Sequence, residues 1–212
     1  MKEIKNLSET AYKKIKHMIL SGELKPGQAI SINAMADTLQ ISRTPVSNAC
    51  QRLEFEKLLT VIPKQGVIIN TISIDAACGL FELRSAIETY NAKKIMDYIT
   101  ERDIEVLKAS IQKQSEYAKS GDCVAFTEED VFFHKYILEK NINSELHSVI
   151  NPIYDRIHLL SINGKSPRML TAVKEHEQIV EKLQEKDTKA FSEAINNNIL
   201  NGLRDLTLQL LG

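Results

Sequence analysis

Residues 42–69 read SRTPVSNACQRLEFEKLLTVIPKQGVII, and this stretch decides the fold of the first third of the chain. Its first half has helical spacing: Ser42 is a suitable N-cap, and Pro45 falls in the first turn, where a missing amide hydrogen is harmless. Its second half has β-branched residues on both sides of Pro-Lys-Gln-Gly at 63–66, which is typical of a short β-hairpin. The stretch therefore predicts a helix with a polar N-terminus, followed by a two-stranded wing.

Two more helices are expected before this stretch. Segment 8–20 has apolar residues at helical spacing, and SGELKPGQAI at 21–30 supplies the glycines and the proline of a turn. Ser31 is a suitable N-cap for a short helix over INAMADTLQ at 32–40. Three helices followed by a hairpin form the layout of a winged helix-turn-helix, in which the third helix enters the major groove of DNA.

The residues expected to contact DNA lie at the N-terminus of the third helix and around it. Arg43 can make two hydrogen bonds to guanine and Asn48 can do so to adenine, while hydroxyl groups and the helix N-terminus hold phosphates. The expected set is Asn33, Ser42, Arg43, Thr44, Ser47, Asn48, Lys64 and Gly66. The same polar residues would also suit a helical hairpin with a solvated surface, and the complete order of elements favours DNA binding over that alternative.

Charge and composition agree with this interpretation. Residues 1–70 hold ten Lys and Arg against six Asp and Glu, a net +4, and the remainder holds seventeen against twenty-two, a net −5. An excess of positive charge at one end suggests contact with nucleic acid there. No apolar run approaches the roughly 18 residues that span a bilayer, and the N-terminus lacks a signal-peptide core, so we expect a cytoplasmic protein without a membrane partner. The three cysteines lack C-x-x-C spacing and are expected to be free thiols.

The chain after residue 72 shows helical periodicity throughout. Six amphipathic helices are expected, at 74–98, 102–119, 122–140, 144–162, 168–186 and 188–211. Because the connections between them are short, they predict an antiparallel bundle. The expected fold class is mainly α, with a winged helix-turn-helix domain at 1–72 and a helical bundle at 73–212.

Four of these helices each turn a polar side chain toward their apolar face. Asp130 and His134 share one face, His176 lies within the apolar stripe of its helix, and Arg84 and Asn198 lie beside the stripes of theirs. Buried polar groups need partners, and converging helices are where bundles build metal and ligand sites. Two imidazoles and a carboxylate suit a first-row transition metal, so Asp130, His134 and His176 are the expected ligands. For either histidine taken alone, a core imidazole satisfied by its neighbours is the alternative.

Both halves of the chain resemble a known family. Residues 24–69 are similar to the DNA-binding domain of the GntR family of bacterial transcription regulators, through Leu-x-Pro-Gly, Ser-Arg-Thr-Pro-Val, Arg-Leu-Glu and the wing glycine. Ser47 and Asn48 stand where that family usually has Arg-Glu. The remaining chain, through FELRSAIE, DVFFH and EHEQIVEKLQEKDTKAFSEAI, resembles the FCD effector domain of FadR-type GntR regulators.

The FCD resemblance implies a divalent metal, such as Zn, Ni or Mn, at Asp130, His134 and His176, and a small ligand held by it, often a carboxylate. Asn198 stands where the family has a third histidine, which implies a weakened metal site, because a neutral amide oxygen is a poor ligand for soft metals. Arg84 matches the family's Glu-x-Arg position. It would pair with an anionic effector or form a structural salt bridge with a neighbouring glutamate.

The expected function is that of a ligand-responsive bacterial transcription regulator, and a repressor in particular. It would bind a palindromic operator as a homodimer, with DNA affinity controlled by an organic acid in the bundle. The alternative is a metal-dependent hydrolase that uses Asp130, His134 and His176. The sequence has no adjacent His-Asp pair, no Gly-rich phosphate loop and no nucleophile elbow, which disfavours that alternative. A third interpretation is a bundle that only dimerises.

Overall fold

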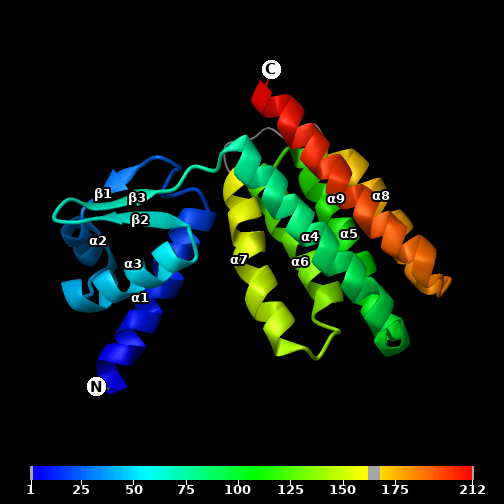
Figure 1. The fold of residues 1–212 in the computed structure, drawn as a ribbon, viewed down its shortest axis with the longest axis horizontal. Coiled ribbons are helices and arrows are strands. Elements are labelled where there is room, and N and C mark those ends of the chain that lie inside the picture. The colour runs from blue at the N-terminus through cyan, green and yellow to red at the C-terminus, as the bar shows by residue number, and fades with distance from the viewer. Residues whose placement is uncertain (1, 162–167, 212) are drawn as a thin grey trace. The chain divides into compact units, whose positions relative to one another are not determined.

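The computed structural model describes residues 2–161 and 168–211, and the chain divides into two compact units, one ending at Ile72 and the other beginning at Ser73 (Figure 1). The first unit contains helices α1 (Lys2–Leu20), α2 (Ile32–Leu39) and α3 (Arg43–Phe55) with a small antiparallel sheet. In the ranges described, the second unit is built from helices alone. The predicted fold class, mainly α with a small wing, is confirmed.

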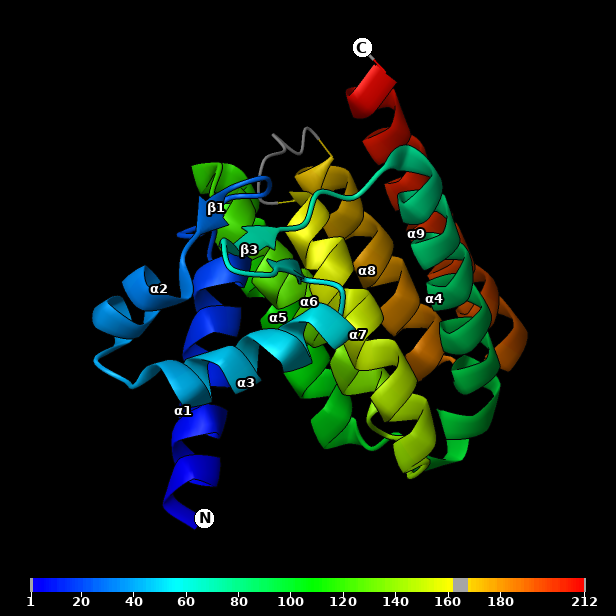
Figure 2. The ribbon, with the colours of Figure 1, turned by 60° about the vertical axis from the view of Figure 1, so that its left-hand side comes forward.

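The helices of the first unit enclose a small apolar core. Helix α1 packs against α3, which crosses it (Figure 2), and the fully buried residues include Ile15, Ile19, Met35, Leu53, Leu58 and Ile69. Ser31 caps α2 as predicted, because its hydroxyl accepts a hydrogen bond from the Ala34 amide at 3.1 Å. Ser42 occupies the N-cap position of α3 without a capping hydrogen bond from its side chain.

The sheet has three strands, one more than predicted. Strands β2 (Leu59–Ile62) and β3 (Gly66–Ile69) form the expected hairpin, and β1 (Ala29–Ile30) pairs with the other edge of β3. A strand of two residues has no periodicity, so the sequence could not reveal it. The added strand explains Gly66, whose φ is +133° and where a Cβ atom would lie 2.3 Å from the Ile30 carbonyl oxygen.

The second unit contains the six predicted helices. They are α4 (Ile74–Ile95), α5 (Glu101–Ser120), α6 (Cys123–Leu138), α7 (Ser144–Ser161), α8 (Met169–Gln184) and α9 (Thr188–Leu211). The predicted segment 74–98 is split, because a 3₁₀ turn at Met96–Tyr98 follows α4. Thr100 and Asp103 form a capping box at the start of α5, and Gly121 ends that helix with φ +76°. Over the described ranges, no helix has the length and apolar character needed to cross a membrane.

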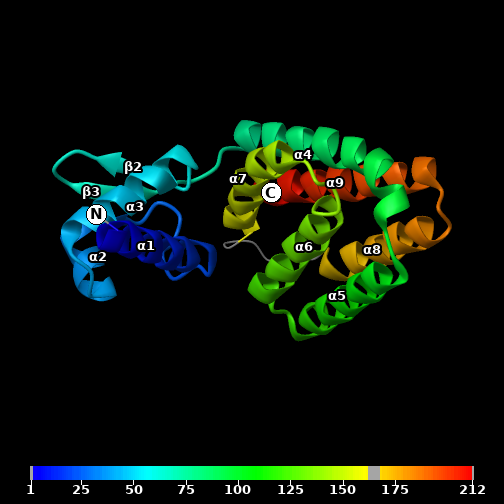
Figure 3. The ribbon, with the colours of Figure 1, turned by 90° about the horizontal axis from the view of Figure 1, so that it is seen from below.

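The helices of the second unit pack so that their apolar faces meet in one interior. Helix α4 runs along α9, and α5 packs against both α6 and α8 (Figure 3). Helix α8 also contacts α9, and α7 lies against α4 and α6. The inward faces of α4, α6, α8 and α9 therefore converge, and these are the helices on which the sequence places its polar residues.

Candidate functional site

Three residues with metal-binding side chains meet inside the bundle. Asp130 and His134 on α6 face His176 on α8, and one ligand atom from each lies within 4.8 Å of the others. His176 Nε2 is 3.4 Å from Asp130 Oδ1. Both imidazoles are buried, whereas the Asp130 side chain is 21% exposed. The donor set and its spacing suit a divalent transition metal.

Each imidazole is oriented by an acceptor at its Nδ1. Glu88 Oε2 on α4 is 2.7 Å from His134 Nδ1, and Gln114 Oε1 on α5 is 2.6 Å from His176 Nδ1. A proton on each Nδ1 leaves the lone pair on Nε2, and within the described parts of the chain neither Nε2 has a hydrogen-bond partner. Because buried nitrogens are normally paired, two unpaired Nε2 atoms beside one carboxylate fit a metal ion.

The charge states of these groups also suit a metal. Burial lowers the pKa of His176 to about 3, so its imidazole is neutral near pH 7. Burial alone would raise the pKa of Asp130, but His134, His176 and Arg84 outweigh burial and lower it. Neutral imidazole and ionised carboxylate are the forms in which these side chains bind metal ions.

Glu88 and Gln114 are site residues that the sequence analysis missed. Glu88 is buried, and it also accepts hydrogen bonds from Arg84 Nε at 2.6 Å and from the Tyr154 hydroxyl at 2.8 Å. Burial alone would raise the pKa of Glu88, but His134 and Arg84 lower it to about 2. The i, i+4 spacing of Arg84 and Glu88 is a signal that could have identified the pair. No comparable signal marks Gln114, because its partner is on another helix.

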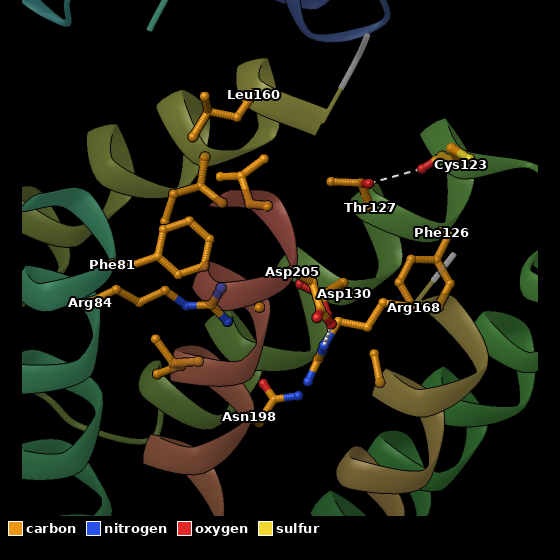
Figure 4. Close-up of a pocket in the computed structure, with 15 residues that line it drawn as sticks. Phe81, Arg84, Cys123, Phe126, Thr127, Asp130, Leu160, Arg168, Asn198 and Asp205 are labelled. Atoms are coloured by element: carbon orange, nitrogen blue, oxygen red, sulfur yellow. Dashed lines mark hydrogen bonds and ion pairs between the residues drawn. The ribbon is translucent and has the colours of Figure 1, made fainter. Parts of the chain in front are cut away.

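Arg84 forms the structural salt bridge that was one of its two predicted roles. Its Nε pairs with Glu88, whereas its Nη2 is buried and has no hydrogen-bond partner in the described ranges. Figure 4 shows the side chain extending from α4 into a cavity that Arg84 helps to line. One arm of the guanidinium therefore stabilises the fold, and the other is available to an anion.

The cavity beside these residues has a volume of about 140 Å³. Its polar lining consists of Arg84, Thr127, Asp130, Arg168, Asn198 and Asp205. Its apolar lining includes Phe81, Phe126, Ile157, Leu160, Ile199 and Leu206. A mostly apolar cavity with a few convergent polar groups is the usual form of a small-molecule site.

Asn198 lines this cavity, but its amide nitrogen is held by a neighbouring carboxylate. Its Nδ2 donates to Glu175 Oε2 at 2.8 Å. Glu175 also accepts from Asn201 Nδ2 at 2.9 Å and from Arg168. The amide is thus oriented by α8, which fixes its nitrogen toward Glu175.

The predicted DNA-contact residues lie mostly on the surface of the first unit. Exposed side chains are those of Asn33, Ser42, Arg43, Thr44, Asn48 and Lys64. Ser47 and Gly66 are half-buried, and the contact with Ile30 gives Gly66 a structural role in the wing. Pro45 and Val46 are buried, so the first turns of α3 are anchored in the core while their polar side chains stay accessible.

A winged helix-turn-helix with an exposed third helix, followed by a helical bundle, defines a class of DNA-binding transcription regulators. Residues 7–69 match the bacterial regulatory proteins of the gntR family, and residues 79–201 match the FCD domain. The chain belongs to the GntR family and carries an FCD domain.

Named relatives are transcription regulators. The HTH-type regulator YdhC of Bacillus subtilis is 23% identical over 188 residues, which cover 87% of this chain and 84% of that protein. The gluconate operon transcriptional repressor of B. subtilis is 24% identical over 191 residues, which cover 85% of this chain and 76% of that protein. The repressor RspR of Escherichia coli is 23% identical over 196 residues, which cover 91% of this chain and 86% of that protein.

Solved structures show the same fold. E. coli McbR/YncC has a TM-score of 0.85 at 20% identity, with 96% of this chain and 98% of that chain covered. A GntR transcriptional regulator from Rhodococcus sp. RHA1 has a TM-score of 0.84 at 16% identity, with 94% and 97% covered. Because the family consists of transcription regulators, the hydrolase alternative is wrong and the protein is not an enzyme.

Proposed function

We propose that this protein is a repressor that binds a palindromic operator as a homodimer, and that a divalent metal ion and a carboxylate effector in the bundle change its affinity for DNA. The observation that carries the proposal is a set of three buried nitrogens: two belong to histidines that cluster with Asp130, and the third belongs to Arg84, which lines the cavity together with Asp130. His134 Nε2, His176 Nε2 and Arg84 Nη2 have no hydrogen-bond partner among the described residues. Each such group costs about 1–3 kcal/mol when unpaired, and a metal ion with its carboxylate ligand would satisfy all three.

Different residues would bind the metal ion and the effector carboxylate. Asp130, His134 and His176 would hold a Zn, Ni or Mn ion through one oxygen and two nitrogens. The ion would supply positive charge to an anion placed beside it. Arg84 would donate from Nη2 to the effector carboxylate while Glu88 keeps its Nε in place.

The position of Arg84 along the chain suggests how effector binding in the bundle could influence the DNA-binding unit. Arg84 lies on α4, and this helix begins at Ile74, directly after the unit that ends at Ile72. The metal ligands lie on α6 and α8. An effector held between Arg84 and the metal would change the packing of α4 against α6 and α8. Such a change alters DNA affinity only if the effector binds the two arrangements unequally.

DNA binding would use the exposed N-terminal turns of α3. In a homodimer the two α3 helices would enter successive major grooves about 34–36 Å apart, which makes the operator palindromic. The excess of positive charge in residues 1–70 supports contact with DNA in this unit.

The test is a titration of the full-length protein against a duplex that it selects from a random-sequence pool. We expect the affinity for this operator, measured by fluorescence anisotropy, to change about 5-fold or more when Zn²⁺ and acetate are both added.

Arg84→Lys keeps a charge beside Glu88 but removes the second donor arm, so it should abolish the response to acetate while retaining DNA binding. Identical titrations with and without the two ligands would overturn effector control. A monomeric mass in solution by light scattering would overturn the homodimer.

A further inference from the structure

The charges around the proposed ion and Arg84 leave room for one negative charge. A divalent ion and Arg84 together bring three positive charges, and the carboxylates of Asp130 and Glu88 bring two negative ones. The other cation in the lining, Arg168, is already paired with Glu175 and with Asp205, whose Oδ2 is 2.6 Å from Arg168 Nε. Arg168, Glu175 and Asp205 together carry one surplus negative charge. One carboxylate on the ligand therefore balances the ion and Arg84 alone, whereas a second would meet Asp205 without a cation to pair with.

The remaining lining offers few partners to a polar ligand. Phe81, Ile157, Leu160, Ile199 and Leu206 present hydrocarbon. The Thr127 hydroxyl already donates to the Cys123 carbonyl oxygen at 2.8 Å, as Figure 4 shows. A ligand rich in hydroxyl groups would lose its hydrogen bonds to water there and would find few replacements. The body of the ligand should therefore be apolar.

Gly202 lies in the wall of the cavity, at a position in helix α9 where the helix itself does not require a glycine. It lies within α9, where glycine is less favourable than alanine, and its backbone is not in the left-handed region. A Cβ atom at this position would lie 3.3 Å from Phe81 Cε1, which is closer than ordinary van der Waals contact. The glycine therefore gives room to Phe81 and to the cavity that both residues line.

The size of the cavity limits the apolar body. Its volume of about 140 Å³ is close to that of an apolar cavity of about 150 Å³ that accommodates benzene in another protein. A six-membered ring is therefore close to the size of body that this cavity accommodates.

From the charge balance, the apolar lining and the glycine in the wall, we infer that the effector is a monocarboxylate whose apolar body is about as large as a benzene ring, and that Gly202 sets the upper size of that body. This inference rests on the proposed function, because it names the class of ligand that the same site would take.

The first test measures the melting temperature of the full-length, Zn-loaded protein with equal concentrations of acetate, benzoate, succinate or D-gluconate. We expect benzoate to raise the melting temperature most, acetate to raise it less, and succinate and gluconate to leave it within error. A rise with succinate or gluconate that equals the rise with benzoate would overturn the ligand class and leave the proposed function standing. Absence of any rise with all four acids would overturn both.

The second test uses a matched pair of glycine variants. Gly202→Ala should lose at least 10-fold in benzoate affinity by calorimetry while keeping its affinity for acetate. Gly79→Ala is the control, because Gly79 also lies within a helix, α4, but a Cβ atom there meets nothing within 4 Å. Equal benzoate affinity in Gly202→Ala and Gly79→Ala would overturn the role of Gly202. Since alanine has a higher helix propensity than glycine, both variants should fold, and their melting temperatures without ligand check that they do.

Discussion

Oε2 of Glu88 lies 2.7 Å from Nδ1 of His134, across the interface between α4 and α6. The other oxygen of the same carboxylate binds Arg84 Nε at 2.6 Å. One buried carboxylate therefore orients both a candidate metal ligand and the candidate anion-binding arginine. Helix α4 therefore contributes to the geometry of the site, although it carries none of the three clustered ligand residues.

Replacing Glu88 should weaken metal binding although Glu88 is not itself one of the three clustered ligands. Glu88→Gln removes the charge that orients His134, and partners of this kind are typically worth about 10–100-fold in metal affinity. Competition with a zinc-sensitive dye measures the dissociation constant. Glu82→Gln is the control, because Glu82 is exposed on the same helix. Equal constants for the two variants would show that Glu88 has no role in metal binding.

His134→Ala should remove the bound ion, because only two of the three clustered ligands remain. The purified protein, saturated with Zn, Ni or Mn and then desalted, is measured by elemental analysis. We expect about one ion per chain in the unchanged protein and far less in the variant. His17→Ala should retain the ion, since His17 is exposed and lies in the other unit. An unchanged protein that retains no ion would exclude the metal site.

Asn198→His should strengthen metal binding. An imidazole is a better ligand than an amide for transition metals, and the substitution also releases the hydrogen bond to Glu175. We expect about a 10-fold gain in Zn²⁺ affinity, equivalent to about 1.4 kcal/mol. Asn201→His is the matched control, because Asn201 also donates to Glu175 but is exposed. A gain in both variants, or in neither, would mean that position 198 does not reach the ion.

Arg43→Ala should weaken operator binding by about 1–3 kcal/mol, because an arginine at the start of the recognition helix can pair with guanine in the major groove. Anisotropy titration with the selected duplex measures the loss. Arg102→Ala removes the same charge from an exposed position on α5 and should have little effect. If the two variants bound DNA equally, the assignment of α3 to the groove would be wrong.

Asp103 should make the bundle sensitive to acid. Burial alone would raise the pKa of Asp103, but hydrogen bonds from Lys140, Thr100 and Tyr136 outweigh burial and lower it well below its usual range. Because the pKa in the folded protein lies below the value of about 3.9 in the unfolded chain, the stabilisation is fully present above that pH and is lost as the pH falls further.

Asp103→Asn should accordingly reduce the free energy of unfolding by about 1–2 kcal/mol at pH 7, because it removes the charged carboxylate that accepts from Lys140, Thr100 and Tyr136, and by less at pH 3. Urea denaturation at the two pH values measures the difference. Asp75→Asn provides the comparison, since Asp75 is exposed in the first turn of α4. A constant difference between Asp103→Asn and the unchanged protein at both pH values would contradict this account.

The sequence by itself determined the order of the helices and of the wing hairpin, the fold class and the family. Helical periodicity, the Ser31 cap, the wing turn and Gly121 are local features, and local features can be recognised without knowing where distant residues lie. The inward-facing side chains of Asp130, His134 and His176 were also predictable, because their spacing relative to apolar neighbours places them on a buried face.

Only the tertiary structure decided how those side chains are held. The partners of His134 and His176 are 46 and 62 residues away along the chain, and the Glu175 contact of Asn198 spans 23 residues. The third strand of the wing and the unpaired Nη2 of Arg84 are likewise products of packing. Spacing within one helix shows which side chains turn inward, but which of them meet depends on how separate helices pack.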